Sequence, residues 1–520
     1  MKIFSGISNK KQTLESLLFA GALASILWSV YFSVITISIP YQIEFREGTA
    51  QVLTGFFLRG ENPFILDSQP LAMNNYGIGY NLVVYPFVGV FGNTLMVHRS
   101  MTFLFVVLSA MLSWFVVYKG SRLFPLGLTC AAFVMVGLIG RGGIGAFPSA
   151  LGTFLFLLAI FVPFLRSFDL AGLALSFVLS LMAFYTKPYF LLAFGIVCSY
   201  LVLFVSKKRG VLYGAFFLAG FSTSVLTVLH LYPLYFVNTI IGNASNTFLT
   251  VEHLTSQLKE LFSSFYPILL FLIFVLGHRA FENRRRGPQV MNPSVDVITW
   301  SRPFFDIPFS FLFYSFLCCL LAFLFVLGPH VGNYLNYAFQ LLVPTFFCWF
   351  FCEFGLAKKF NELFILVVLL NLFSWESKVL DPNKLKQKDS KEWARVSEYV
   401  RLSSTILNSP AVAAEVVTLG RIPMDSGQTS YFYTVEHFPD NLLTRTSYSE
   451  FYDDGLRYTL LIDHMIEKQR FDLVITTREK EAFYHEQILW DYYDVVDEIR
   501  VDMPQSNQQW TLVVWQPLIK

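Results

Sequence analysis

Two glutamates stand close together in the segment YQIEFREGTAQVLTGFFLRGENPF (residues 41–64), which directly follows a long apolar segment. A carboxylate within hydrogen-bond reach of a hydroxyl group can take its proton during attack, which typically accelerates a reaction by about 10²- to 10⁴-fold. Glu47 is the first candidate for such a general base, and Glu44 is the second. The alternative is that either carboxylate simply forms an ion pair with Arg46 or Arg59.

Two cations interrupt apolar sequence further along the chain. Lys187 lies in AFYTKPYFLL, where an unpaired charge is costly unless a cavity, a phosphate or a carboxylate receives it. Arg141 lies among glycines in LIGRGGIGAF, where backbone amides could approach an anion. Both residues are therefore candidates for binding an anionic group near the membrane. The alternatives are a lysine whose ammonium group reaches the membrane surface, and a flexible turn between helices.

The composition places these residues in a polytopic membrane protein. Of the 520 residues, 55% are hydrophobic and 14% are charged, and the mean hydropathy is +0.54, which excludes a soluble globular chain. The 38 basic and 36 acidic residues give a net charge of +2, so no overall field favours nucleic acid as a partner. The six cysteines lie in apolar segments and show neither a disulfide framework nor zinc-ligand spacing.

The apolar residues fall into twelve segments that we predict to be helices of the membrane domain. The first segment has about 23 residues, which is longer than the apolar core of a signal peptide and long enough to span about 30 Å of hydrocarbon. We therefore expect it to be retained, with the N-terminus in the cytoplasm. The twelve segments are residues 17–39, 77–93, 97–118, 123–140, 147–165, 170–186, 189–206, 211–236, 261–278, 307–328, 333–355 and 360–374.

Loops rich in lysine and arginine orient these helices, because such loops stay in the cytoplasm. The richest loops are residues 206–210, 278–287 and 356–359. This orientation places the first loop, residues 40–76, on the outer side of the membrane. Six apolar segments lie between this loop and residues 206–210, whereas an odd number of crossings is needed. One of the six must therefore be broken, re-entrant or split.

The composition changes after residue 375 to a mixed polar chain with ordinary charge density. This change divides the chain into a membrane domain, residues 1–375, and a C-terminal domain, residues 376–520, which the same orientation places outside the cytoplasm. Residues 471–477 and 510–517 have the composition of strands, and EWARVSEYVRLSSTIL and YTLLIDHMIEKQ have helical spacing. The sequence therefore predicts a soluble α/β domain after the last apolar segment.

The first loop also has the pattern of a short amphipathic helix. In EGTAQVLTGFFLRG, the residues Val52, Leu53, Phe56 and Phe57 fall on one face at helical spacing. We expect this helix to lie flat on the membrane, where it would hold both glutamates at the lipid boundary.

The order of these features resembles the GT-C superfamily of integral membrane glycosyltransferases, especially the branch related to protein O-mannosyltransferases and aminoarabinose transferases. The resemblance covers most of the chain and implies a GT-C-like fold of about 11 to 13 transmembrane helices with a C-terminal soluble α/β domain. The motifs that carry it are, in chain order, REGTAQVLTGFFLRGENPF, NYGIGYNLVVYPFVGVFGNTLMVHR, TKP at 186–188 and GPHVGNYLNYAFQLLVP at 328–344.

The resemblance implies an inverting glycosyltransferase in the plasma or inner membrane. Its donor would be a polyprenyl-phosphate-linked sugar, its acceptor a glycan, lipid or protein at the extracytoplasmic face, and its general base a carboxylate. The phosphate that leaves needs positive charge or hydrogen-bond donors near the membrane. The candidates for binding the donor phosphate and the substrate are Lys187, Arg141, His330, Asn333, Tyr334, Tyr337, Asn75 and Tyr76. For the group around His330, the alternative is a helix cap with an aromatic belt at the interface.

The sequence departs from the pattern of that branch at two places. Arg46 occupies the place of the Asp in an Asp-Glu pair that relatives often carry, which leaves Glu44 and Glu47 to share the assignment of the base. The segment NNYGIGY stands where relatives often have Lys-Pro-Pro.

Other classes of membrane protein remain open. A lipid or glycan flippase, a polymerase or ligase of surface polysaccharide, and a non-catalytic binding subunit would also need many helices and intramembrane cations. Transport would predict discontinuous helices in two related halves, which the sequence does not display. Some GT-C relatives use a divalent cation, but the pairs His230 with Tyr232 and Glu252 with His253 lack a third ligand at fixed spacing. The sequence therefore predicts no metal site and leaves the cofactor open.

Overall fold

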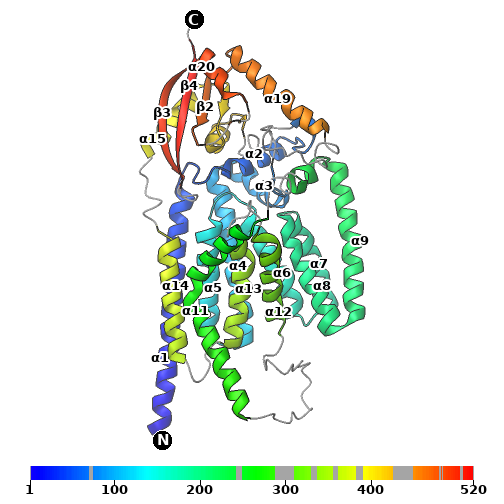
Figure 1. The fold of residues 1–520 in the computed structure, drawn as a ribbon, viewed down its shortest axis with the longest axis vertical. Coiled ribbons are helices and arrows are strands. Elements are labelled where there is room, and N and C mark those ends of the chain that lie inside the picture. Colours follow the sequence, from blue (N-terminus) through cyan, green and yellow to red (C-terminus); the bar gives the residue numbers. More distant parts are fainter. Residues whose placement is uncertain are drawn as a thin grey trace.

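The computed structural model is a tall bundle of helices with a small sheet at one end (Figure 1). The N-terminus lies at the end of the bundle opposite the sheet. The structure describes residues 2–68, 74–241, 249–286, 310–329, 336–354, 361–381, 390–425, 449–479, 482, 484–503 and 508–518.

Each of the twelve predicted apolar segments corresponds to a helix or to consecutive helical turns. Five described helices are long and apolar enough to cross a membrane, and they cover Gln12–Ser38, Leu95–Ser121, Pro188–Val205, Lys207–Leu231 and Val251–His278. The chain is thus a multi-pass membrane protein. The helical elements of the bundle are α1 (Lys2–Ser38), α2 (Glu47–Leu58), η1 (Leu66–Ser68), α3 (Gly79–Phe91), α4 (Leu95–Ser121), α5 (Phe124–Gly137), η2 (Leu138–Gly142), α6 (Ser149–Leu165), α7 (Leu170–Phe184), η3 (Pro188–Leu191), α8 (Leu192–Tyr200), η4 (Leu201–Val205), α9 (Lys207–Leu231), η5 (Val237–Ile241), α11 (Val251–Arg286), α12 (Phe311–Ala322), η6 (Phe323–Leu327), α13 (Asn336–Phe354) and α14 (Asn361–Val379).

Helix α3 is the short helix that forms from the predicted apolar segment 77–93. It has 13 residues, which gives a length of about 20 Å and is too short for a bilayer core of about 30 Å. Both ends of α3 contact α2. Asn81, near the start of α3, donates two hydrogen bonds to α2, and Asn93, just past the end of α3, exchanges two hydrogen bonds with Gln51 of α2. Both ends of α3 thus lie against the same neighbouring helix.

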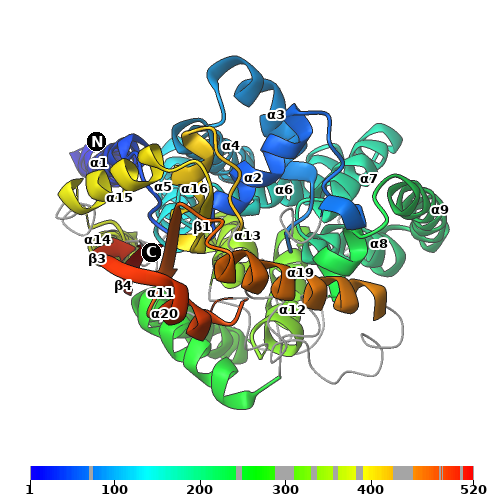
Figure 2. The same cartoon turned by 90° about the horizontal axis from the view of Figure 1, so that it is seen from above.

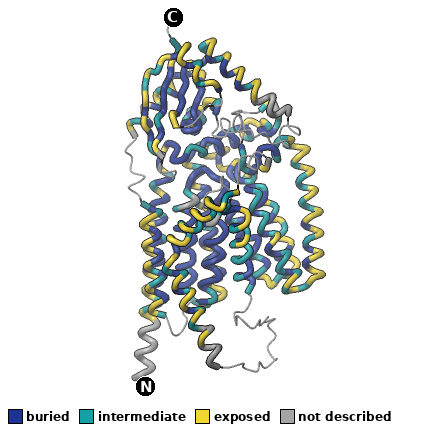
Figure 3. Tube along the Cα trace, in the orientation of Figure 1, coloured by how far each residue is buried: buried dark blue, intermediate teal, exposed yellow. Residues whose placement is uncertain are grey.

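The interior helices pack through apolar and aromatic side chains, whereas the outer helices leave their apolar residues exposed. Figure 3 shows this contrast between the buried centre of the bundle and α9 at its edge. Only 11% of the most apolar 18-residue stretch of α9 is buried, although the mean hydropathy of that stretch is 1.7. Apolar side chains on such an outer surface are what a lipid environment requires.

The C-terminal residues form a four-stranded mixed sheet with short helices, in the order β1-β2-β4-β3. Strand β1 pairs parallel with β2, and the other two pairings are antiparallel. Strands β2 and β4 lie where the sequence predicts strands, and helices α15 and α19 lie where it predicts helices. The elements are α15 (Ser390–Leu402), β1 (Ile406–Asn408), η8 (Pro410–Val412), α16 (Ala413–Thr418), α19 (Ser449–Glu467), β2 (Leu473–Thr477), η9 (Glu486–Ile488), α20 (Leu489–Tyr492), β3 (Tyr493–Met503) and β4 (Gln508–Pro517). We call residues 390–518 the sheet region.

The sheet region sits directly on the loop between α1 and α2. Figure 2 shows α16 beside α2 when the molecule is seen from above. The ring of Tyr41 stacks on Trp393 at 4.9 Å, and the ring of Phe45 stacks on Trp510 at 5.5 Å. Gly48 of α2 lies so close to α16 that an added Cβ would come within 2.6 Å of the Cβ of Ala413.

Helix α2 therefore differs from its prediction in one respect. The helix itself forms over the expected residues, but it is sandwiched between the bundle and the sheet region, with most of its residues buried. Val52 and Phe56 pack near Val417 of α16, while Leu53 packs in a second cluster with Tyr235. Its apolar side chains thus contact protein on more than one side, rather than forming a single face toward lipid.

Candidate active site

Glu47, the first candidate for the base, is the first residue of α2 and is fully buried. Its carboxylate receives two hydrogen bonds from Arg99 of α4, with Nε–Oε1 at 2.9 Å and Nη2–Oε2 at 2.7 Å. The backbone N–H groups of Ile43 and Ala146 donate to the same two oxygens at 2.8 and 3.1 Å. Each oxygen of Glu47 therefore accepts two hydrogen bonds, from donors in three separate segments of the chain.

Arg99 is equally buried and completes this arrangement. Its guanidinium also donates to the carbonyl oxygens of Thr36, Ile39 and Tyr41 at 3.1, 2.6 and 2.7 Å. These carbonyls lie at and after the end of α1, where a helix leaves its last carbonyl groups without partners. The pair of Arg99 and Glu47 thus joins α1, the first loop, α2 and α4, and it acts as a support of the site.

Glu44, the second candidate, lies in the loop before α2 and is 3% exposed. Its Oε1 is 2.6 Å from Nε of Arg46, and its Oε2 accepts from the backbone N–H of Arg46 at 2.6 Å. Burial raises the pKa of the Glu44 carboxyl above its ordinary value, although the neighbouring Arg46 acts in the opposite direction. A raised pKa brings a carboxylate closer to the range that suits a general base at neutral pH. The two carboxylates thus differ in their partners: Glu47 accepts hydrogen bonds from Arg99, whereas Glu44 accepts them from Arg46.

Lys187 lies in the short link between α7 and η3, and its side chain is enclosed by tyrosine rings. Its Nζ is 4.8 Å from the ring centre of Tyr76, 5.2 Å from that of Tyr337 and 5.9 Å from that of Tyr189. Lys187 is buried, and no carboxylate of the described part of the chain forms an ion pair with it. We call Lys187 and these three tyrosines the lysine cage.

The environment of the cage has a direct effect on the charge of the lysine. Burial, together with the positive charge of Arg46, lowers the pKa of Lys187 from 10.5 to about 7. Aromatic faces attract a cation but do not neutralise it. A buried ammonium group with this surrounding is suited to receive an anion from outside the protein.

The glycines of NNYGIGY explain why Tyr76 reaches Lys187. The N–H groups of Gly77 and Gly79 donate to the carbonyl oxygens of Thr186 and Tyr185 at 3.1 and 2.7 Å. An added Cβ on Gly77 would lie 2.1 Å from the carbonyl oxygen of Tyr185, so only glycine allows this approach. These two hydrogen bonds place Tyr76 next to Lys187, the residue that follows Thr186.

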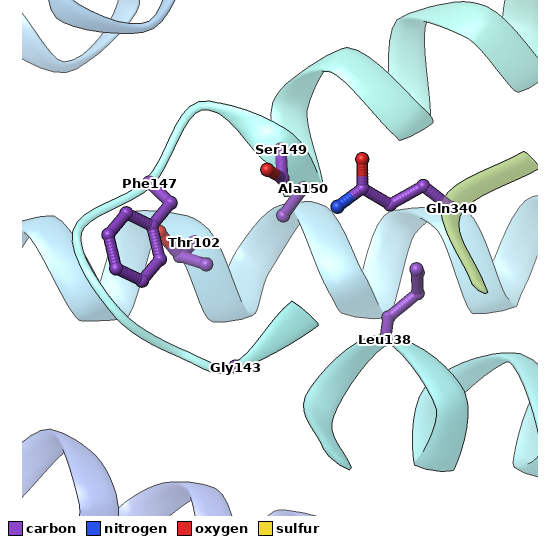
Figure 4. A pocket seen from close by; sticks show the side chains of 7 residues that line it. All are labelled: Thr102, Leu138, Gly143, Phe147, Ser149, Ala150 and Gln340. Atoms are coloured by element: carbon purple, nitrogen blue, oxygen red, sulfur yellow. The ribbon is translucent and has the colours of Figure 1, made fainter. Parts of the chain in front are cut away.

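The surroundings of Arg46 connect the carboxylate to the lysine cage. Nη1 of Arg46 donates to the hydroxyl of Tyr76 at 3.3 Å, and its guanidinium lies 5.6 Å from the ring centre of Phe147. Phe147 lines a cavity of about 10 Å³, which is room for about one water molecule. Figure 4 shows Gln340 of α13 pointing toward Ser149 in this cavity.

Gln340 also belongs to the surroundings of the lysine cage. Its Oε1 accepts a hydrogen bond from the hydroxyl of Tyr189, and the ring of Tyr189 meets that of Tyr337 edge to face at 4.8 Å. The residues between Glu44 and Lys187 thus form one continuous group at the end of the bundle that faces the sheet region.

The other predicted residues are less informative. Asn75 lies in the loop beside Tyr76 but in none of the contacts that define the cage. Arg141 lies in η2, and its side chain is outside the described residues, as are His330, Asn333 and Tyr334. Within the described ranges, no group of three or more His, Cys, Asp or Glu side chains could hold a metal ion.

Three residues of this region carry roles that the sequence did not indicate. Arg99 was part of a motif without a stated partner, and Tyr189, two residues after Lys187, gave only the weak signal of an aromatic residue beside a cation. Gln42 is fully buried, and its Nε2 donates to the carbonyl oxygens of Glu44, Phe45 and Pro410. Its Oε1 accepts from the N–H of Ala414 at 2.6 Å, so one side chain joins the first loop to the sheet region.

Comparisons with known proteins agree with this architecture. No protein-family model matches the chain, and no curated protein sequence matches it. The structure is similar to two crystal structures of ArnT from Cupriavidus metallidurans, one bound to undecaprenyl phosphate and one in the apo state. The TM-scores are 0.57 and 0.56 at 10% sequence identity, and both alignments cover 95% of this chain and 97% of ArnT. The chain therefore shares the fold of these ArnT structures, which agrees with the resemblance that its sequence motifs indicate.

Proposed function

We propose that the chain is an inverting glycosyltransferase that takes its sugar from a polyprenyl-phosphate-linked donor. The single observation that carries this proposal is Lys187, a buried cation that faces three tyrosines and has no carboxylate partner among the described residues. A lipid phosphate supplies the anion that such a site requires. The ArnT structure with undecaprenyl phosphate supports the same class of donor, because the two chains share their fold.

The reaction needs a base and an anion site close together. The hydroxyl of the acceptor attacks the anomeric carbon of the sugar, Glu44 takes its proton, and the bond from that carbon to the phosphate oxygen breaks. The phosphate leaves with the electron pair, and Lys187 stabilises the charge that develops on it. A single displacement inverts the anomeric configuration. Arg46 and Tyr76 lie between the two residues, which supports this division of roles.

The orientation of the chain follows from the same proposal. We infer that α3, both of whose ends contact α2, does not cross the membrane, so that eleven of the twelve apolar segments cross it. The two ends of the chain then lie on opposite sides, and the loops rich in lysine and arginine make the N-terminus cytoplasmic and the sheet region extracytoplasmic. The C-terminal domain, residues 376–520, then covers the reacting site from the outer side. The acceptor, which is a glycan, a lipid or a protein, would approach at that face.

The test uses the purified full-length chain in lipid nanodiscs with a panel of polyprenyl-phosphate sugars and mixed acceptors. We expect release of polyprenyl phosphate with one donor, and a fall in kcat of about 10²- to 10⁴-fold for Glu44→Gln. Glu61→Gln is the matched control, because Glu61 pairs with Arg59 on an exposed part of the same loop and should keep full activity. Transport of the lipid without sugar transfer would instead support a flippase. Full transfer by Glu44→Gln would remove Glu44 as the base.

A further inference from the structure

Arg46 contacts both halves of the proposed site. Its Nε is 2.6 Å from Oε1 of Glu44, and its Nη1 is 3.3 Å from the hydroxyl of Tyr76. The ring of Tyr76 in turn lies 4.8 Å from Nζ of Lys187. One tyrosine thus separates two cations, one of which is paired with the carboxylate of the site.

The two cations repel each other in the empty site. The charge of Arg46 is one of the two causes that lower the pKa of Lys187. An anion that binds between like charges replaces this repulsion with two attractions. A phosphate group with its several acceptor oxygens can accept hydrogen bonds from both side chains at once, and the planar fork of arginine suits it especially well.

Arg46 is also more exposed than Arg99, the other arginine of this region. Arg99 is fully buried and donates to Glu47 and to three carbonyl groups. The side chain of Arg46 is 23% exposed, and its guanidinium lies at 5.2 and 5.6 Å from the rings of Phe45 and Phe147. A long arginine side chain at a partly exposed position can change its hydrogen-bond partner by rotation about its side-chain bonds, without a rearrangement of the backbone.

We propose that Arg46 pairs with Glu44 in the empty site and turns to the phosphate of the donor lipid when that lipid binds. This inference rests on the proposed function and assigns to Arg46 a role of its own in it. Binding of the donor would thereby release the carboxylate that takes the proton. The carboxylate would stay blocked in the absence of donor.

The exchange also suits the charges of the reaction. A donor phosphodiester carries one negative charge, and the departing phosphate gains a second one, so two cations match the product. Once Arg46 has turned away, Glu44 loses the neighbour that acts against the rise of its pKa. The carboxylate therefore becomes a stronger base at the stage at which a base is needed.

The test measures the affinity of undecaprenyl phosphate for the full-length chain in nanodiscs at pH 7. Arg46→Gln should weaken binding by about 10- to 100-fold, because it removes a charge-assisted hydrogen bond. Glu44→Gln should tighten binding by about 2- to 5-fold, because Arg46 no longer has to leave an ion pair. In the double variant Arg46→Gln/Glu44→Gln, the change at Glu44 should no longer tighten binding of the lipid. Arg59→Gln, which removes the exposed arginine of the same loop, is the control and should bind as the original chain does.

Each outcome separates this inference from the proposed function. If Lys187→Gln weakens binding but Arg46→Gln does not, the exchange is wrong and the lysine cage remains the phosphate site. If Glu44→Gln tightens binding equally in the Arg46→Gln chain, general electrostatics rather than an exchange of partner explains it, and the inference is overturned. If the original chain does not bind the lipid, both proposals fail. Arg46→Lys, which keeps the charge, should restore part of the affinity and so exclude misfolding as the cause of the loss.

Discussion

The lowered pKa of Lys187 predicts how binding of a lipid phosphate depends on pH. In the empty protein the lysine loses its proton at about pH 7, so about one tenth of it is protonated at pH 8. A bound anion favours the protonated form and raises the pKa of the lysine again. Binding above pH 7 therefore takes up a proton, and the affinity is highest below pH 7 and falls as the pH rises.

The size of this fall follows from the strength of the contact. A hydrogen bond to a charged group contributes about 1.5–3 kcal/mol, which corresponds to a rise of about 1–2 units in the pKa of Lys187 on binding. The affinity should then fall by about 5- to 25-fold between about pH 7 and pH 9. A lysine with an ordinary pKa of 10.5 would leave the affinity unchanged over this range.

The assay is equilibrium binding of a synthetic polyprenyl methyl phosphodiester, whose single negative charge stays constant from pH 6 to about pH 10. Lys187→Arg should bind with no pH dependence between pH 7 and 9, because the guanidinium stays protonated. Lys187→Gln should bind weakly at every pH. Glu44→Gln should show the same fall in affinity with rising pH, because Lys187 causes this fall. A flat profile for the original chain, or the same fall in Lys187→Gln, would refute the reasoning.

Three further predictions concern the frame of the site. Glu47→Gln alone or Arg99→Met alone should lower the free energy of unfolding by about 3–5 kcal/mol in a denaturation series, and the double variant should recover part of this loss. If the losses of the two single variants simply add in the double variant, the two residues are not a coupled pair. Gln42→Leu removes two hydrogen bonds within the first loop and two that join this loop to η8 and α16, so kcat should fall more than KM changes. An unaltered rate and unaltered protease resistance would speak against a positioning role for Gln42. Gly77→Ala forces the loop away from the α7–η3 link and should weaken phosphodiester binding, whereas Gly89→Ala, whose added Cβ would have its nearest neighbour 4.0 Å away, should leave binding unchanged. Equal effects of the two changes would exclude the close backbone approach at Gly77 as the cause.

Elements that depend on local sequence were predicted well. The twelve apolar segments form helices because hydropathy and helical spacing act within one segment, and α2 begins at Glu47 as its periodicity indicated. Strand β2 lies within residues 471–477 for the same reason. The exception is α3, whose apolar composition resembles that of a crossing helix. Its 13 residues and its contacts with α2 at both ends set it apart, and only the structure contains those contacts.

The partners of the charged residues could not be predicted in the same way. Glu47 and Arg99 are 52 residues apart, and nothing in the spacing of the two motifs reveals that one carboxylate accepts from that one arginine. Lys187 and Tyr337 were each expected at a phosphate site, but their approach depends on how α13 packs against η3. Which arginine pairs with each of the two glutamates depends likewise on tertiary contacts, since both glutamates stand in the same short stretch of sequence.

The bond between Gln42 and the sheet region has a consequence for how this chain can vary. The loop that carries Glu44 has its other side pressed against η8 and α16, so its shape is determined by two parts of the chain that lie more than 360 residues apart. A change in the length of the turn at Pro410 would be transmitted to the carboxylate as a displacement. Exchanging the C-terminal region for that of a distant relative should therefore impair the chemistry itself, because one of the two surfaces that hold the loop in place would change.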